Sequence, residues 1–280
     1  MKIDLALILT SLAALTGLVW LLDRLLFAPK RRLMQAEGEE VHEPVVVDYA
    51  RQLFPIIFIV LVLRSFLAEP FRIPSSSMMP TLLVGDFILV NKFAYGIRLP
   101  VLNTKVIDVG APERGDVVVF RYPGMGPDDP NAGADYIKRI VGLPGDQITF
   151  RDQTLLVNGQ PVPKQAAGVY VGSGQGRAMT GATRFEVDLD GRVHATLETS
   201  PFSSPRAEGV WEVPEGHYFA MGDNRDKSRD SRFLDDVGYI PKVNLVGRAG
   251  FLFLSVDGAV WKFWEWANSL RFERFFQAIE

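Results

Sequence analysis

The sequence predicts a mainly β protein in which two N-terminal transmembrane helices precede a β-rich domain with a smaller inserted β-subdomain. Two long apolar runs lie near the N-terminus, and short apolar runs separated by Gly-Asp, Asn-Gly and Asp-Gly pairs fill the rest of the chain. A hydrophobic content of 48% is high for a soluble domain and fits a membrane-anchored one.

The first apolar run extends from Ile3 to Leu22. About 20 such residues span a bilayer as a helix. A cleavable leader is the alternative, but Lys2 is the only cation before the run, and Asp23-Arg24 closes it without a small-x-small cleavage site. We therefore expect residues 1–23 to form a retained transmembrane helix.

The second apolar run, Leu53 to Ala68, is shorter and carries Arg64 near its end, from where the side chain can snorkel to the headgroups. A buried core helix is the alternative, but the neighbouring first run favours a second span over residues 53–69. The polar connection, residues 24–52, holds more cations than the segments outside the two runs. The positive-inside rule therefore places it in the cytoplasm and everything after residue 70 across the membrane.

After residue 70 the pattern is that of short strands. A Gly-Asp pair precedes three of the strands, at residues 85–86, 115–116 and 145–146. Two further pairs, Asn158-Gly159 and Asp190-Gly191, have the composition of two-residue hairpin turns. We expect β-hairpins at both positions.

Residues 165–205 are richer in small residues and poorer in large apolar ones than the flanking sequence. We therefore expect a main β-domain formed by residues 70–150 and 211–280, with a smaller β-subdomain inserted at 151–210. The tail from Trp261 clusters aromatic residues with lysine and arginine. It fits a segment at the membrane interface and a terminal helix packed on the domain equally well.

Composition argues against several functions. The chain has no cysteine, which excludes disulfides and thiol nucleophiles, and its three histidines are not in metal-ligand spacing. A net charge of -3 without a basic stripe gives no support for nucleic-acid binding. Residues 221–234 fail as a calcium loop, because Arg225 and Leu234 stand where ligands are required. Residues 142–145 lack the Gly-Lys-Ser/Thr of a phosphate loop. We expect no metal and no cofactor.

Serine is the remaining candidate nucleophile and, since the histidines are isolated, the candidate bases are lysine and carboxylates. Three serines, residues 75–77, lie between two prolines directly after the second apolar run. A serine hydroxyl needs an adjacent base, and Lys138 lies in a strand with apolar neighbours on both sides. Burial lowers the pKa of a lysine by up to about 3–5 units, into the range of a general base. The alternatives are ordinary loop serines and a lysine that points outward from an edge strand.

A third cluster, GDNRDKSRDSR at residues 222–232, alternates opposite charges and indicates a turn held by its own ion pairs. With PSSSMMPTLLVGDFILV, and with RGDVVVFRYP followed by DYIKRIVGLPGD, it forms a set that resembles the bacterial type I signal peptidases in order and topology. The resemblance covers residues 1–155 and 211–250, and it is weaker over the inserted subdomain and the tail.

The resemblance implies a serine endopeptidase with a Ser/Lys dyad in a catalytic β-domain. Ser77 matches the nucleophile and Lys138 the general base, while Ser75 matches the hydroxyl that completes the oxyanion hole with the backbone N–H of Ser77. In the third cluster, Ser228 matches the residue that orients the lysine, and Asp230 and Arg232 match a supporting ion pair. The family's apolar substrate-binding positions correspond to Phe71, Ile73, Pro74, Met78, Leu82, Ile88, Val119, Tyr136 and Ile137.

Two departures from the family pattern stand out: Ser76 replaces a frequent glycine, and the cysteine pair of some relatives is absent. The implied function is removal of signal peptides from exported preproteins in a bacterial inner membrane, with the catalytic domain on the periplasmic side. Preproteins and membrane lipid are the expected partners. One rival is another Ser/Lys hydrolase, which need not have two spans. The other is a membrane-tethered β-domain that binds envelope proteins without catalysis.

Overall fold

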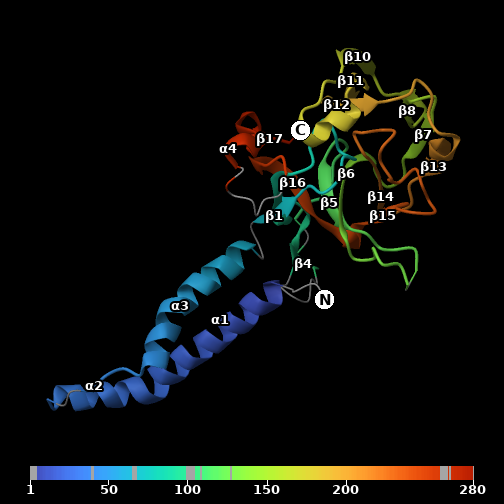
Figure 1. The fold of residues 1–280 in the computed structure, drawn as a ribbon. Helices are drawn as coiled ribbons and strands as arrows, with labels where there is room; N and C mark the ends of the chain where they lie inside the picture. The colour runs from blue at the N-terminus through green and yellow to red at the C-terminus, as the bar shows by residue number, and fades with distance from the viewer. Residues whose placement is uncertain are drawn as a thin grey trace. The chain divides into compact units, whose positions relative to one another are not determined.

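A computed structural model describes residues 5–38, 41–64, 68–98, 105–107, 109–126, 128–258, 264 and 266–279. The chain divides into two compact units (Figure 1), one of residues 1–68 with 96–108, and one of residues 69–95 with 109–280. The described residues of the first unit are mainly helical and include a short strand pair, β3 (Ile97–Arg98) with β4 (Lys105–Ile107). The second unit is mainly β.

The first unit holds two helices that are long and apolar enough to cross a membrane. Helix α1 (Leu5–Leu22) continues through a π-helical turn, η1 (Asp23–Phe27), into α2 (Ala28–Ala36). Helix α3 (Val45–Val62) begins before the apolar run at Leu53, because backbone hydrogen bonding continues through polar residues. The sequence predicts the second span over residues 53–69; residues 65–67 lie outside the described residues, and Ala68 and Glu69 belong to strand β1 (Ala68–Arg72) and not to the helix.

Helices α1 and α3 pack through aromatic rings, one of which lies against a glycine. The rings of Trp20 and Phe54 lie 5.6 Å apart, and a Cβ atom added to Gly17 would lie 2.7 Å from the Phe54 ring. Small residues allow such close approach between helices in lipid, where no hydrophobic effect drives the helices together. Gly17 therefore leaves the space that the Phe54 ring occupies.

The second unit is built on one large sheet with the strand order β1-β2-β16-β5-β6-β14-β15, and β17 pairs with β16. Strand β6 lies inside the sheet, between β5 and β14. Its Lys138 pairs with Val118 of β5 and its Arg139 with Met221 of β14. The strands are β1 (Ala68–Arg72), β2 (Asp86–Asn91), β5 (Val117–Arg121), β6 (Asp135–Gly142), β14 (His217–Met221), β15 (Ile240–Pro241), β16 (Leu245–Ser255) and β17 (Gln277–Ala278).

Two smaller sheets contain the strands between β6 and β14. One has the order β13-β7-β8-β9 and the other β10-β11-β12. Their strands are β7 (Gln147–Arg151), β8 (Thr154–Val157), β9 (Gln160–Pro161), β10 (Lys164–Val169), β11 (Thr183–Leu189), β12 (Arg192–Glu198) and β13 (Gly209–Glu212). The separate β10-β11-β12 sheet is consistent with an inserted subdomain, whose boundaries at 151 and 210 stay a prediction.

Both predicted hairpins are confirmed. Strands β8 and β9 pair antiparallel around Asn158 and Gly159, whose φ angles are 51° and 77°. Strands β11 and β12 pair antiparallel around Asp190 and Gly191, with φ angles of 56° and 82°. Positive φ at both central residues is the requirement of a type I′ turn, which explains these residue types.

The three Gly-Asp pairs form one repeated turn. Each glycine has a positive φ, at Gly85 (+90°), Gly115 (+93°) and Gly145 (+84°). Each following carboxylate accepts a backbone N–H three residues upstream, from Leu83 to Asp86 (2.7 Å), Glu113 to Asp116 (3.0 Å) and Leu143 to Asp146 (2.6 Å). Each carboxylate also pairs with arginine from distant sequence: Asp86 with Arg274, Asp116 with Arg248 and Asp146 with Arg114.

The described part of the C-terminal tail packs on the second unit. It forms α4 (Trp266–Ser269), a 3-10 turn η8 (Phe272–Arg274) and β17, while residues 261–263, 265 and 280 lie outside the described part of the chain. Arg274 donates to the backbone oxygen of Thr81 at 2.9 Å, and Arg271 to that of Val84 at 2.8 Å. The tail thus holds the loop that follows the three serines. Its contact with lipid stays a prediction.

Candidate active site

Ser77 and Lys138 meet in a buried position. Ser77 lies in the loop between β1 and β2, and Lys138 lies in the middle of β6. Lys138 Nζ is 2.9 Å from Ser77 Oγ, and it also donates to the carbonyl oxygen of Ile137 at 2.9 Å. Lys138 is 5% exposed and Ser77 is 7% exposed. The lysine therefore points inward, toward the serine, and not to solvent from an edge strand.

The surroundings of Lys138 favour its neutral form. Burial lowers the pKa of Lys138 to about 8, and the carboxylates of Asp230 and Asp223 oppose this shift without cancelling it. Neither carboxylate contacts the ammonium, because each is paired with an arginine. A lysine with this pKa is a competent general base near neutral pH.

Ser75 and Ser76 take different positions beside the dyad. Ser75 Oγ lies 3.3 Å from Ser77 Oγ, at the exposed side of the loop. Asn224 forms hydrogen bonds to the backbone carbonyls of Ser76 and Ser77. Its backbone N–H donates to Ser77 O and its side-chain amide donates to Ser76 O, both at 3.0 Å. The loop is therefore held through its backbone, which leaves the Ser77 hydroxyl free to react. Reasoning from the sequence missed Asn224, although it belongs to the third cluster.

The predicted ion pair of the third cluster is present in the described structure. Arg232 donates to both carboxylate oxygens of Asp230, at 2.8 and 2.9 Å, and Gly222 N–H donates to the same carboxylate at 2.9 Å. Burial alone would raise the pKa of Asp230, but the Arg232 guanidinium holds it below its usual range. Ser228 is buried beside this pair, and its Oγ has no hydrogen-bond partner of ordinary geometry, Lys138 included, among the residues described. Its orienting role stays a prediction.

A second buried ion pair lies next to the dyad and was missed by the sequence reasoning. Arg139, adjacent to Lys138, donates to both carboxylate oxygens of Asp223 at 2.9 and 2.8 Å, and both side chains are 1% exposed. Thr81 Oγ1 donates to the same carboxylate at 2.5 Å. Asp223 therefore joins the strand of the base, the loop of the nucleophile and the third cluster. The signal available in the sequence was that Asp223 belongs to the third cluster and Arg139 directly follows Lys138.

The predicted substrate-binding residues fall into two groups. Most belong to one apolar cluster beside Ser77, namely Phe71, Ile73, Met78, Leu82, Ile88, Val119 and Ile137. Pro74 is exposed outside that cluster. Tyr136 packs with a different apolar cluster, stacks on Tyr122 with ring centroids 4.9 Å apart, and lies 5.8 Å from Lys138 Nζ. Tyr136 points away from Ile137 because successive side chains of a strand alternate between faces.

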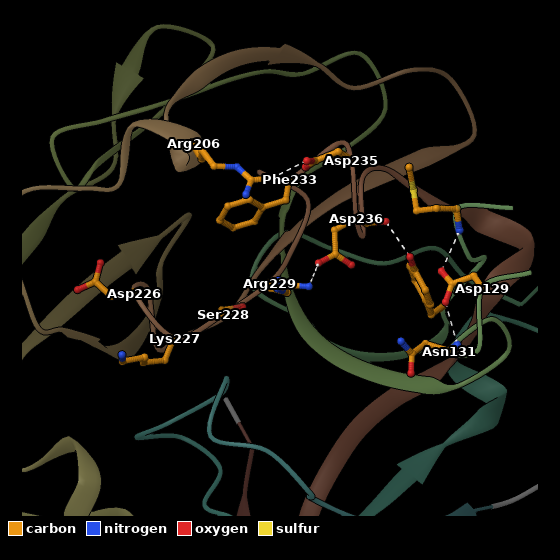
Figure 2. A pocket seen from close by; sticks show the side chains of 12 residues that line it. Asp129, Asn131, Arg206, Asp226, Lys227, Ser228, Arg229, Phe233, Asp235 and Asp236 are labelled. Carbon is orange, nitrogen blue, oxygen red and sulfur yellow. Dashed lines mark hydrogen bonds and ion pairs between the residues drawn. The ribbon is translucent and has the colours of Figure 1, made fainter.

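A polar cavity of about 600 Å³ opens on the side of Tyr122 and Ser228. Figure 2 shows its charged rim, where Arg229 points to Asp236 and Arg206 to Asp235. None of the predicted apolar substrate-binding residues lines this cavity. Its chemistry is therefore different from that of the apolar cluster.

Gly222 leaves the space in which Ser228 and Ser77 approach each other. A Cβ atom at residue 222 would lie 2.5 Å from Ser77 O and 2.5 Å from Ser228 Cβ, and closer still to Ser228 Oγ. We expect Gly222→Ala to lower kcat of any reaction that begins with attack by Ser77 Oγ by about 100-fold, because misplacing a reacting group by about 1 Å has such an effect. Gly126→Ala is the matched control, since nothing lies within 4 Å of its added Cβ atom. Equal rates in the two variants would contradict the prediction.

The family of the chain follows from comparison with known sequences. The family model described as "Signal peptidase, peptidase S26" matches residues 46–254, which include Ser77, Lys138 and the third cluster. The chain belongs to this signal peptidase family. The resemblance carried by the three motifs is thereby confirmed at the level of the family.

The curated relatives are more specific. The chain is 45% identical over 276 residues to the signal peptidase I of Pseudomonas fluorescens, covering 91% of this chain and 93% of the relative. It is 35% identical to the signal peptidase I of Haemophilus influenzae, over 98% of this chain and 92% of the relative. A crystal structure of a signal peptidase I from Enterococcus faecalis is 26% identical and covers 50% of this chain and 98% of its own, with a TM-score of 0.29 that carries no argument about the fold.

Proposed function

We propose that the chain is a membrane-bound serine endopeptidase of the signal peptidase I type, which removes signal peptides from exported preproteins. The observation that carries the proposal is the 2.9 Å approach of a buried lysine amine to a buried serine hydroxyl, in a chain of this family. The names of the relatives support the substrate class.

The proposed mechanism uses Ser77 as nucleophile and Lys138 as base. Neutral Lys138 takes the hydroxyl proton as Ser77 Oγ attacks the scissile carbonyl, and the lysine then gives a proton to the departing amine. Water hydrolyses the resulting ester with the lysine again as base. The Ser75 hydroxyl and the Ser77 backbone N–H are the proposed donors to the carbonyl oxygen as its negative charge develops.

The surroundings are proposed to serve binding and position. The apolar cluster at Ile73, Met78 and Ile137 would accept the small apolar side chains before the cut. Pro74 and Tyr136, which lie outside this cluster, stay proposed substrate-binding residues. The two apolar helices would anchor the protein in the bacterial inner membrane. The excess of cations between them supports a cytoplasmic connection and a catalytic domain on the periplasmic side.

The pH dependence of cleavage tests the proposed base. Lys138 acts in its neutral form, so activity is lost by protonation as the pH falls below its pKa of about 8. We expect kcat/KM for a preprotein, measured on the solubilised full chain, to rise about tenfold per pH unit up to about pH 8 and then to level off. A profile that levels off near about 6.5, the usual pKa of histidine, would contradict a lysine base.

A further inference from the structure

A second cavity, of about 420 Å³, lies between residues 199–207 and the loop of residues 225–233. Arg225, Asp226, Ser200 and Ser204 are among the residues that line it. The cavity is separate from the Ser77–Lys138 contact, and neither Ser77 nor Lys138 lines it. A ligand in this cavity would therefore not be bound by the dyad.

The guanidinium of Arg225 is the unusual group of this cavity. Arg225 is only 4% exposed, its Nε is buried without a hydrogen-bond partner, and none of the hydrogen bonds or ion pairs of the described residues involves its side chain. Its backbone is fixed, because its N–H donates to Leu197 O at 3.0 Å and its carbonyl accepts from Arg232 at 2.7 Å. The side chain is therefore held at the cavity without a protein acceptor.

The carboxylates around Arg225 are all committed to other donors. Asp223 is paired with Arg139, Asp230 with Arg232 and Glu198 with Lys164. The Asp226 carboxylate accepts from two backbone N–H groups, at Thr199 and Ser200, from the Thr199 hydroxyl and from the Gln153 amide.

Burial lowers the pKa of Arg225 to about 10, so the group is still charged at neutral pH. A buried charge without a partner is costly, and buried polar groups in folded proteins are nearly always satisfied.

We propose that this cavity binds a small oxyanion of the phosphate or sulfate class, held by the Arg225 guanidinium and the Ser200 and Ser204 hydroxyls. A guanidinium presents parallel N–H donors that match two oxygens of such an anion, which a spherical chloride does not offer. Ser200 Oγ accepts from Phe202 N–H at 3.1 Å, so its own proton remains available to the anion. The proposal rests on this geometry and not on the proposed peptidase activity.

Calorimetric titration of the solubilised full chain with sodium phosphate tests the site, with sodium chloride at matched ionic strength as reference. We expect saturable binding of phosphate and a melting temperature that rises with its concentration, because a ligand of the native state stabilises it. Arg225→Gln should abolish both effects. Arg229→Gln should retain both, because Arg229 lies on the same loop with an 82% exposed side chain and does not line the cavity.

A second variant tests the same site if Arg225→Gln fails to fold. Ser200→Ala combined with Ser204→Ala leaves the arginine in place and should weaken phosphate binding about 100-fold, because each of the two lost hydrogen bonds to a charged group costs about tenfold. The proposal is overturned if chloride shifts the melting temperature as much as phosphate does. It is also overturned if a folded Arg225→Gln keeps the phosphate response, since phosphate then binds without the Arg225 guanidinium.

Discussion

Replacing Ser77 with alanine, or Lys138 with methionine, is expected to reduce the rate of preprotein cleavage by roughly 10⁴-fold or more. The two residues act as a unit through the contact of Nζ with Oγ, so the double variant should be no slower than the slower single variant. The measurement is cleavage of a preprotein in detergent by the wild type and the variants. This effect is larger than the one expected for Gly222→Ala, because these variants remove the proposed nucleophile or base and no other described group can act in its place.

Folding must be separated from catalysis in this experiment. Lys138→Met keeps the packing volume and removes a buried amine, so its melting temperature should equal or exceed that of the wild type. Ser76→Ala is the matched serine control and should retain activity, because Asn224 holds the Ser76 carbonyl and not its hydroxyl. Full activity in a folded Ser77→Ala variant would contradict the dyad. Failure of the wild type to cut would favour the rival, a binding domain without catalysis.

Asp223→Ala is expected to lower the free energy of unfolding by about 3–5 kcal/mol, because it leaves the buried Arg139 guanidinium without its carboxylate. The same change frees the Thr81 hydroxyl and loosens the segment that carries Asn224. Chemical denaturation of the solubilised chain measures the first effect, and preprotein cleavage should fall in parallel.

Two comparisons make this prediction specific. Asp235→Ala removes an exposed ion pair with Arg206, whose side chains are 72% and 68% exposed, and should cost less than about 1 kcal/mol. Arg139→Met combined with Asp223→Leu should recover much of the stability, since apolar residues often replace a buried pair without loss. Equal destabilisation by Asp223→Ala and Asp235→Ala would show that Arg139 has another way to be satisfied.

The parts of the fold that the sequence predicts are those set by local chemistry. Asn158-Gly159 and Asp190-Gly191 require positive φ angles that other residue pairs rarely adopt, so both hairpins are predictable. Strand β16 is different, because it pairs with β2, β5 and β17, which lie far apart in the sequence. The docking of the tail depends on such pairing, and its mixture of aromatic and basic residues fits a membrane interface as well.

The candidate site shows the same division. Ser77 and Lys138 lie in motifs that predict their chemistry. Arg139, Asp223 and Asn224, which hold the two residues in place, lie in the same motifs, but the motifs do not show which of their side chains contact each other. The Arg139–Asp223 pair joins residues 84 apart in the chain, and no periodicity or spacing indicates that contact. Tyr136 was grouped with Ile137 from the family motif, although the two side chains lie in different clusters.

The attachment of the nucleophile loop to the end of the chain has a consequence for biosynthesis. Thr81 is held by Asp223 through its hydroxyl and by Arg274 through its carbonyl. Since a chain leaves the ribosome from its N-terminus, Ser77 and Lys138 emerge long before these two residues. We expect the unfinished protein to hold both reactive groups without the contacts that align them. Cutting would then begin only after Asp223 and Arg274 have been synthesised and have docked on the loop of the nucleophile.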